Sequence, residues 1–283
     1  MITASTRRAQ YAADEDAPGA PDAPYRNRAE PPHAAVRRWQ QLWRESVTDA
    51  RELLAALGLS DQAPSLLPAR DTGFALRVPR GFIARMRQGD PADPLLLQVL
   101  PRAAELDQIP GFTRDAVGDM AARAAPGVLH KYQGRALLIA TGACAIHCRY
   151  CFRRHFPYAE EAAAAGAWHE SIAHIRADTS ISEVIVSGGD PLALSTPKLA
   201  ELTEGLATIR HVRRLRLHTR LPIVLPERVD AELTHWLTHL PWPMTTVVLH
   251  ANHANELDGN VADACARLRA TGAMLLNQSV LLR

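Results

Sequence analysis

The sequence predicts an α/β fold in which a parallel sheet curls towards a barrel. A chain of 283 residues is long enough for one large α/β domain and a smaller appendage. After residue 133, apolar runs of strand length recur about every thirty residues, and helix-like segments separate the later runs. Polar side chains directly follow each run, which is the position of an active site at the carboxyl ends of parallel strands.

Composition argues against several classes of protein. A formal net charge of +2 is too small to indicate nucleic acid or an anionic membrane as a partner. No apolar run approaches the roughly eighteen residues that span a bilayer, and the polar N-terminus lacks the apolar core of a secretory signal. Three of the four cysteines are clustered, unlike a disulfide framework. We therefore expect a reduced, cytoplasmic protein.

Taken in order, the chain divides into three parts. Residues 1–35 mix proline, alanine and charge without periodicity, which predicts a disordered tail. Residues 36–133 are expected to form a helical cap, because apolar residues recur at helical spacing from Trp39 until Gly58 stops the pattern. Residues 134–283 are expected to form the partial barrel. Its predicted strands are 136–140, 183–186, 214–217, 245–249 and 273–276, with helices that include 196–208 and 260–271.

Cys144, Cys148 and Cys151 follow the first predicted strand with the spacing Cys-x3-Cys-x2-Cys. Three soft sulfur ligands on one loop suit an iron–sulfur cluster or, with a fourth ligand, zinc. A [4Fe–4S] cube held by three cysteines leaves one iron open to a small molecule. The alternative is a structural zinc site with His147 or His155 as its fourth ligand.

Other loops at the same edge offer further candidate ligands. Gly188 and Gly189 let the backbone approach a ligand closely, and Asp190 offers an anion to an ammonium group or a ribose hydroxyl; the alternative is a tight turn that binds nothing. Arg153 can bind a carboxylate bidentately or form part of a solvated basic turn. The cations and phenol of residues 130–135 either clamp a phosphate or border the sheet. No metal is assigned to His218, His250 or His253, and Cys265 is expected to be a small buried apolar residue.

The cysteine spacing with Tyr150 before the last cysteine is similar to the radical S-adenosylmethionine (SAM) signature. Further motifs lie at residues 74–80, 130–132, 148–158, 187–192, 220–226, 252–256 and 276–283. Together these motifs resemble one family, the radical SAM lysine 2,3-aminomutases, and most closely its branch that makes (R)-β-lysine for translation elongation factor P. The resemblance runs from about residue 43 to the last residue.

The resemblance implies a mechanism. A reduced [4Fe–4S] cluster on Cys144, Cys148 and Cys151 would cleave SAM to a 5′-deoxyadenosyl radical, which takes hydrogen from lysine held as an imine on pyridoxal phosphate (PLP). Arg153 would hold the substrate carboxylate. The residues implied to face SAM are Gly188, Gly189, Asp190 and Gln278, with Tyr150 beside the cluster, and those implied to face PLP are Arg135, Lys131 and Tyr132. The implied partners are free lysine, a reductase for the cluster and, indirectly, elongation factor P; a homo-oligomer stays open.

One departure from the family concerns the PLP lysine, which the resemblance places far downstream of the last cluster cysteine. The only lysines are Lys131 and Lys198, and neither has a matching context. The chain ends at Arg283 without the sixth strand and the acidic residues expected for the substrate ammonium group. We therefore expect a C-terminally truncated relative. The alternatives are a radical SAM protein that has lost the PLP reaction, an inactive fragment, and a non-catalytic zinc-binding module.

Overall fold

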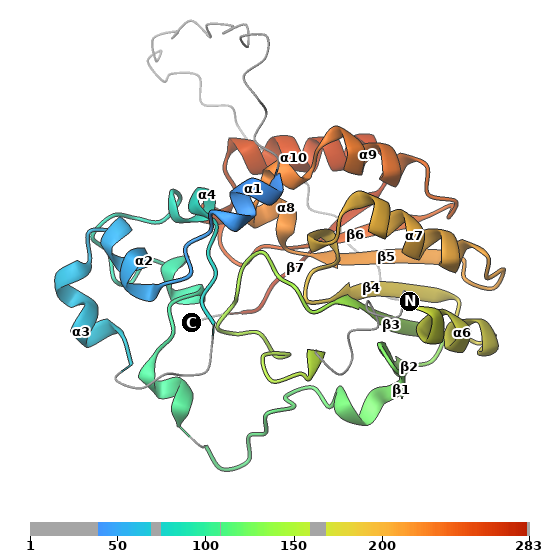
Figure 1. Cartoon of the computed structure of the whole chain (residues 1–283), viewed down its shortest axis with the longest axis horizontal. Helices are drawn as coiled ribbons and strands as arrows, with labels where there is room; N and C mark the ends of the chain where they lie inside the picture. Colours follow the sequence, from blue (N-terminus) through green and yellow to red (C-terminus); the bar gives the residue numbers. More distant parts are fainter. Residues whose placement is uncertain (1–38, 69–74, 108, 159–167, 282–283) are drawn as a thin grey trace, which may run out of the picture. The chain divides into compact units, whose positions relative to one another are not determined.

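The computed structural model describes residues 39–68, 75–107, 109–158 and 168–281. Its centre is a sheet of seven strands in sequence order (Figure 1). The first three strands pair antiparallel, and the last five pair parallel. The strands are β1 (Arg123–Ala125), β2 (Val128–Tyr132), β3 (Arg135–Thr141), β4 (Glu183–Gly188), β5 (Arg214–Thr219), β6 (Thr245–His250) and β7 (Met274–Gln278).

The five predicted strands are confirmed, with boundaries that differ by one or two residues. The expected partial barrel of the radical SAM type, preceded by helices, is likewise confirmed. The antiparallel strands β1 and β2 add to the prediction, in which residues 130–135 come just before the first strand and either clamp a phosphate or border the sheet. Both strands belong to the sheet although they precede residue 134. The division of the chain into a cap over 36–133 and a barrel over 134–283 therefore stays a prediction. The predicted tail over 1–35 lies outside the described residues.

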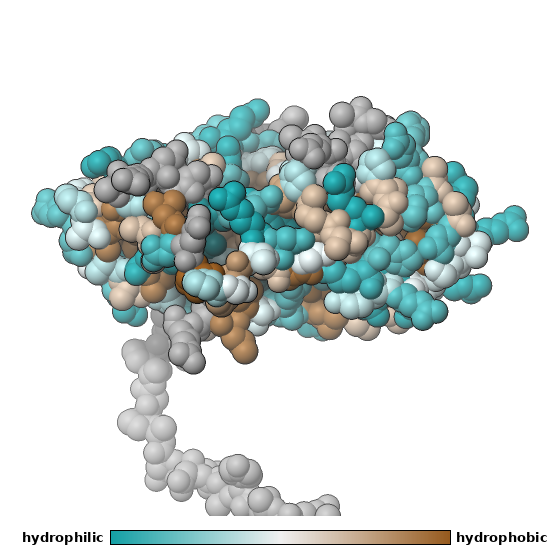
Figure 2. All heavy atoms as spheres, turned by 90° about the horizontal axis from the view of Figure 1, so that it is seen from below, coloured by the Kyte–Doolittle hydropathy of each residue, from teal (hydrophilic) through white to brown (hydrophobic). Residues whose placement is uncertain are grey.

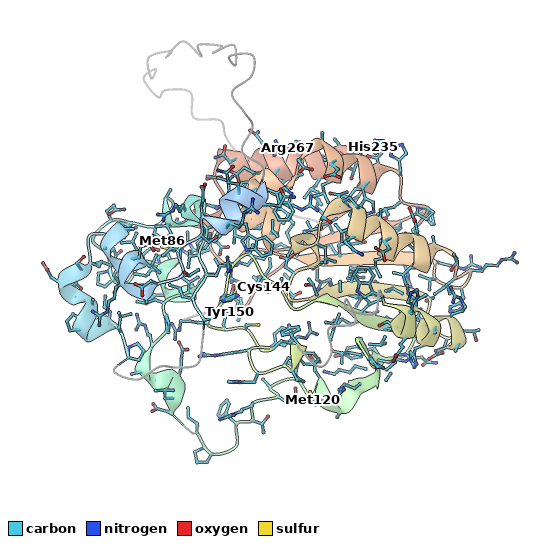
Figure 3. All side chains as sticks on the ribbon, in the orientation of Figure 1. Met86, Met120, Cys144, Tyr150, His235 and Arg267 are labelled. Atoms are coloured by element: carbon cyan, nitrogen blue, oxygen red, sulfur yellow. The ribbon has the colours of Figure 1, made fainter. Side chains whose placement is uncertain are left out.

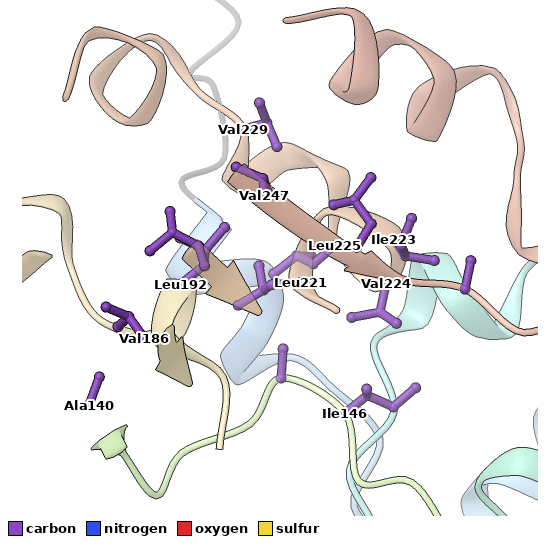
Figure 4. Close-up of a cluster of buried hydrophobic side chains, with 14 of the residues drawn as sticks. Ala140, Ile146, Val186, Leu192, Leu221, Ile223, Val224, Leu225, Val229 and Val247 are labelled. Carbon is purple, nitrogen blue, oxygen red and sulfur yellow. The ribbon is translucent and has the colours of Figure 1, made fainter. Parts of the chain in front are cut away.

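Helices cover one face of the parallel strands (Figure 1). Successive residues of a strand point to opposite faces, and the buried set Val184, Val186, Leu215, Leu217 and Val247 belongs to the same apolar core as the helices. Figure 4 shows part of this core. The helices after β3 are α6 (His169–Ala177), α7 (Thr196–Ala207), α8 (Leu221–Val224), α9 (Ala231–Thr238) and α10 (Gly259–Ala270).

Local sequence explains where several helices begin. Asp230 and Asp258 precede α9 and α10, and each side chain accepts a hydrogen bond from a backbone N–H in the first turn. In the N-terminal region, Asp49 caps α2 in the same way, and the chain leaves α2 through Gly58 at φ 69°. The helices of that region are α1 (Trp39–Arg44), α2 (Ala50–Ala56), α3 (Ala63–Leu66) and α4 (Arg80–Ile83).

Short 3₁₀ helices fill many of the connections. They are η1 (Ser60–Gln62), η2 (Leu96–Gln98), η3 (Ala103–Leu106), η4 (Met120–Ala122), η6 (Pro191–Ala193), η7 (Pro226–Arg228) and η8 (Ala254–Glu256). Within the described parts of the chain, no helix has the length and apolar character needed to cross a membrane. The face shown in Figure 2 is largely hydrophilic, with apolar residues interspersed among the polar ones.

Candidate functional site

The face of the sheet opposite the helices lines a cavity of about 660 Å³. Alternate residues of neighbouring strands reach it, because pairing in register places Leu137 beside Ile185 and His218 beside Val248. The loops that follow the carboxyl ends of β3, β4 and β5 close the cavity at one end. All twelve candidate site residues that the sequence and the family resemblance indicate line this cavity: Cys144, Cys148, Cys151, Tyr150, Arg153, Gly188, Gly189, Asp190, Gln278, Arg135, Lys131 and Tyr132.

The cysteine loop lies between the sheet and the N-terminal region, where Figure 3 shows Cys144 and Tyr150. Backbone hydrogen bonds tie it to that region: His147 N donates to Arg77 O at 3.1 Å, and Arg149 N donates to Gln98 O at 2.8 Å. All three cysteines are partly buried and free of disulfides. Burial raises the pKa of the Cys144 and Cys151 thiols, so a bound cation is needed to favour their thiolate forms.

The arrangement of the three thiols fits a cube better than a single metal ion. Ligands that converge on one zinc ion lie close together, whereas a cube presents separate iron corners to its cysteines. Among the described residues, the three sulfur atoms do not all lie within 4.8 Å of one another. The proposed fourth zinc ligand His147 instead places Nδ1 2.5 Å from Ala75 O. Three thiols that face one cavity from a single loop thus fit a [4Fe–4S] cluster.

Gly188 and Gly189 are explained by close contact between two protein segments. A Cβ atom on Gly188 would lie 2.5 Å from Thr141 O, and one on Gly189 would lie 2.3 Å from Ala143 O. Gly188 also has φ +117°, which side chains rarely adopt. The sequence predicts that these glycines let the backbone approach a ligand. In the structure they let the loop after β4 pack directly on the cysteine loop.

Asp190 anchors the same loop. The sequence predicts that its carboxylate holds an ammonium group or a ribose hydroxyl. In the structure the side chain is buried and both oxygens accept hydrogen bonds from the protein, and burial raises the carboxyl pKa. The donors are Thr219 Oγ1 at 2.7 Å, Arg220 N at 2.8 Å, and Leu192 N and Leu221 N at 3.0 Å. These bonds fix the end of β4 to the end of β5, which is a positioning role.

A group that we call the Arg220 cluster (Arg220, Gln98, Glu256, Asn252 and Tyr150) lies beside the cysteine loop. Arg220 Nη1 donates to Cys148 Sγ at 2.7 Å and to the Tyr150 hydroxyl. Its Nη2 donates to Gln98 Oε1 at 2.6 Å and to Glu256 Oε2 at 3.0 Å. Asn252 Nδ2 donates to both Gln98 and Tyr150. One guanidinium therefore joins the cysteine loop, the N-terminal region and the loops after β5 and β6.

The surroundings of Arg220 and Glu256 favour the charged form of both side chains. Burial by itself disfavours the guanidinium of Arg220, but the neighbouring Cys148, Tyr150 and Glu256 outweigh burial and raise its pKa. Glu256 is fully buried, yet Arg220 and hydrogen bonds from Gln98 and Asn252 hold its pKa below the usual value. The ion pair is accordingly maintained at neutral pH.

Arg153, Lys131 and Asp119 form a second charged group, the Arg153 cluster, at another wall of the cavity. Arg153 Nε donates to Asp119 Oδ2 at 2.7 Å, and Lys131 Nζ donates to Asp119 Oδ1 at 3.1 Å and to Val117 O. Arg153 is thus paired with a carboxylate of the chain itself, where the sequence predicts a substrate carboxylate. Asp119 had not been singled out from the sequence.

The remaining residues that the sequence singles out lie outside these two clusters. Arg135 and Arg216 flank the buried carboxylate of Glu183, with Arg216 Nε donating at 2.7 Å and Arg135 Nε 3.8 Å away. Tyr132 is 64% exposed, so its phenol is accessible although it borders the cavity.

Burial lowers the pKa of His218 and of His250 to about 4, so both imidazoles are neutral at pH 7. Cys265 is partly buried against the core, as expected.

Comparison with known proteins agrees with the site. Residues 133–215 match the family model described as a 4Fe-4S single cluster domain. The L-lysine 2,3-aminomutase of Haemophilus influenzae is 43% identical over 255 residues, which are 90% of this chain and 75% of the relative. The L-lysine 2,3-aminomutase of Escherichia coli is 45% identical over 247 residues, or 87% of this chain and 71% of the relative. That of Clostridium subterminale is 31% identical over 87% of this chain and 58% of its own length.

The matches run through both regions that build the cavity, because they extend well beyond the cysteine loop on either side. Identity of 43% and 45% over most of both chains shows membership of the same family. The chain therefore belongs to the L-lysine 2,3-aminomutase family.

Proposed function

We propose that the chain is an L-lysine 2,3-aminomutase that uses a [4Fe–4S] cluster, SAM and PLP to convert L-α-lysine to (R)-β-lysine. The observation that carries the proposal is the convergence of three free thiols and a set of cations on one cavity of about 660 Å³. Cys144, Cys148 and Cys151 would hold the cluster. When bound, the cluster would supply an electron for SAM cleavage, and PLP would supply a conjugated system that stabilises an unpaired electron on the substrate.

The chain's own residues orient these groups. Arg220 would donate a hydrogen bond to the Cys148 thiolate and hold the cysteine loop against the loops after β5 and β6. Gly188, Gly189 and Gln278 line the cavity beside the cysteine loop, where the backbone would face SAM. Neutral His218 and His250 add hydrogen-bonding groups without charge. The enclosing walls would exclude water from reactive species.

Arg153 would bind the carboxylate of lysine by exchanging its partner Asp119 for the substrate. Arg135, Lys131 and Tyr132 line the far part of the cavity and would face the phosphate of PLP. Of the two lysines, Lys198 lies on α7 and pairs with Glu201 at 2.6 Å, and Lys131 is paired with Asp119. In this chain, therefore, cationic side chains would hold PLP by binding its phosphate group.

The use of the product and the source of electrons for the cluster are proposed from the same family resemblance. (R)-β-Lysine made here would be used to modify elongation factor P, and a reductase would reduce the cluster. The thiols that would hold the cluster are free, which favours a reduced, cytoplasmic location.

The test is an activity assay on protein reconstituted anaerobically with iron and sulfide. With dithionite, SAM, PLP and L-α-lysine, we expect β-lysine to form, and Cys148→Ser to abolish it. The matched control Cys265→Ser changes the cysteine outside the loop and should retain activity. SAM cleavage without β-lysine would contradict the aminomutase assignment and leave a radical SAM protein. Zinc bound in place of iron and sulfide would contradict both.

A further inference from the structure

A cluster of metal-ligating side chains lies between β2 and α6, outside the cavity. His130 is on β2, His174 is on α6, and Asp178 ends that helix; one ligand atom from each lies within 4.8 Å of the others. Leu129, Lys131 and Tyr132 of the same strand line the cavity, but His130 does not. The hydroxyl of Ser171 donates to Pro126 O at 2.7 Å, which fixes α6 against the β1–β2 turn.

The carboxylate of Asp178 is already oriented. Ser180 donates to its Oδ1 from both the backbone N, at 3.0 Å, and the hydroxyl, at 2.6 Å. The other oxygen, Oδ2, lies 3.4 Å from His130 Nδ1. Neighbouring ligand atoms of a tetrahedral zinc ion with bonds of about 2.1 Å are about 3.4 Å apart. Hydrogen bonds from outer residues that fix a ligating carboxylate are typical of metal sites.

His174 distinguishes a metal site from a simple ion pair. His130 and Asp178 by themselves would make an ordinary histidine–carboxylate pair. His174 Nε2, however, is buried and has no hydrogen-bond partner among the described residues. A buried imidazole nitrogen without a partner is costly unless a ligand satisfies it. His174 and Asp178 are one helical turn apart, so both reach the same side of α6.

We propose that His130, His174 and Asp178 bind one zinc ion. Two imidazole nitrogens and one carboxylate oxygen are ligands that zinc accepts, and they leave a fourth position for water. The ion would join β2, which lies between the edge strand β1 and β3, to α6, the helix that leads from the cysteine loop to β4. It stabilises the part of the sheet that carries Lys131, without taking part in the chemistry of the cavity.

The test uses untagged protein with its cluster reconstituted, because free cluster thiols would also bind zinc. Zinc titration against a competing chelator should show one tight site per chain, and zinc in excess of the site should raise Tm by about 5 °C. His174→Gln should weaken binding at least about 100-fold and abolish the Tm shift. Ser180→Ala keeps all three ligands and should weaken binding about 10-fold, which tests the site without removing a ligand.

Two exposed histidines provide the matched control. His235 on α9 and His239 at the end of that helix have ring centroids 4.2 Å apart with the rings tilted by 37°, and such a pair can also bind zinc at the surface. Figure 3 labels His235. His239→Gln should leave the tight site and the Tm shift intact. Loss of binding in His239→Gln with retention in His174→Gln would overturn the proposal, as would a holoprotein that binds no zinc in the titration.

Discussion

Arg220 and Arg153 border the same cavity, but their surroundings differ. The guanidinium of Arg220 donates hydrogen bonds to four residues from three segments of the chain, and its carboxylate partner Glu256 is fully buried. Arg153 is held through Asp119, which it shares with the partly exposed Lys131. The first arrangement cannot lose a member without leaving buried groups unpaired, whereas the second can exchange one carboxylate for another. The Arg220 cluster therefore builds the site, and the Arg153 cluster is suited to bind a ligand.

The largest expected effect is on the Arg220 cluster. Arg220→Met should lower the free energy of unfolding by about 3–5 kcal/mol, because it leaves the buried Glu256 carboxylate without its cation. Denaturant unfolding at pH 7 measures the loss. In the double variant with Glu256→Gln the loss should be smaller than the sum of the single losses.

A second buried arginine serves as the control. Arg228 is fully buried, donates to the carbonyls of Leu192 and Leu194, and lies 3.8 Å from the partly exposed Asp230. Arg228→Met leaves no buried carboxylate unpaired and should cost less than Arg220→Met. Equal losses in the two variants would show that the Arg220 cluster contributes no more than an ordinary buried guanidinium.

The next largest expected effect is a dependence of stability on pH. It comes from two buried histidines, one near each cluster. Arg153 is among the charges that act on His218, and His250 lies edge-on to Tyr150 at 5.7 Å. Burial lowers both pKa values to about 4, so the unfolded chain binds protons below about pH 6.5 that the folded chain does not. Stability is therefore lost as pH falls, by about 2 kcal/mol per histidine between pH 6.5 and 5.

Variants separate the two histidines in denaturant titrations at several pH values. His218→Gln and His250→Gln should each remove about half of this pH dependence, while the exposed His169→Gln should leave it unchanged. If only His250→Gln flattens the curve, the wall near Arg153 is hydrated enough for His218 to titrate normally, and the contrast between the two clusters is sharper than the burial indicates.

Local pattern was sufficient to predict the parallel strands and the cysteine loop. Buried parallel strands such as β4 are continuous apolar runs, and the three cysteines lie within one short segment. The strands β1 and β2 escaped prediction because they are short and mixed in polarity. Gln98 and Glu256 hydrogen-bond across 158 residues of sequence, so no local signal joins them. Arg220 and Glu256 stand in motifs that identified the family, but their mutual contact appears only once the chain is folded.

The Asp190 loop shows why residue type alone leaves two roles open. Two glycines and an aspartate after a strand suit both ligand binding and close packing of two backbones. The distinction depends on where Thr141 O and Ala143 O lie, which the sequence of the loop does not encode. Donors to Asp190 likewise come from β5 and the segment after it, about thirty residues further along the chain.

The smallest expected effect on stability is at Asp119. Asp119→Asn removes the charge of a buried carboxylate but keeps an oxygen acceptor for Arg153, and the Lys131 side chain is 30% exposed, so we expect a loss of about 1–2 kcal/mol in the free energy of unfolding. The exposed pair Lys198–Glu201 sets the baseline, since Glu201→Gln should cost at most about 0.5 kcal/mol. The sharper readout is binding of a carboxylate. Because Arg153 no longer faces an internal anion, L-lysine should raise the Tm of Asp119→Asn more than that of the unmodified protein. An equal rise in both would mean that Arg153 does not exchange Asp119 for a ligand, and the difference between the two arginines would then be one of burial alone.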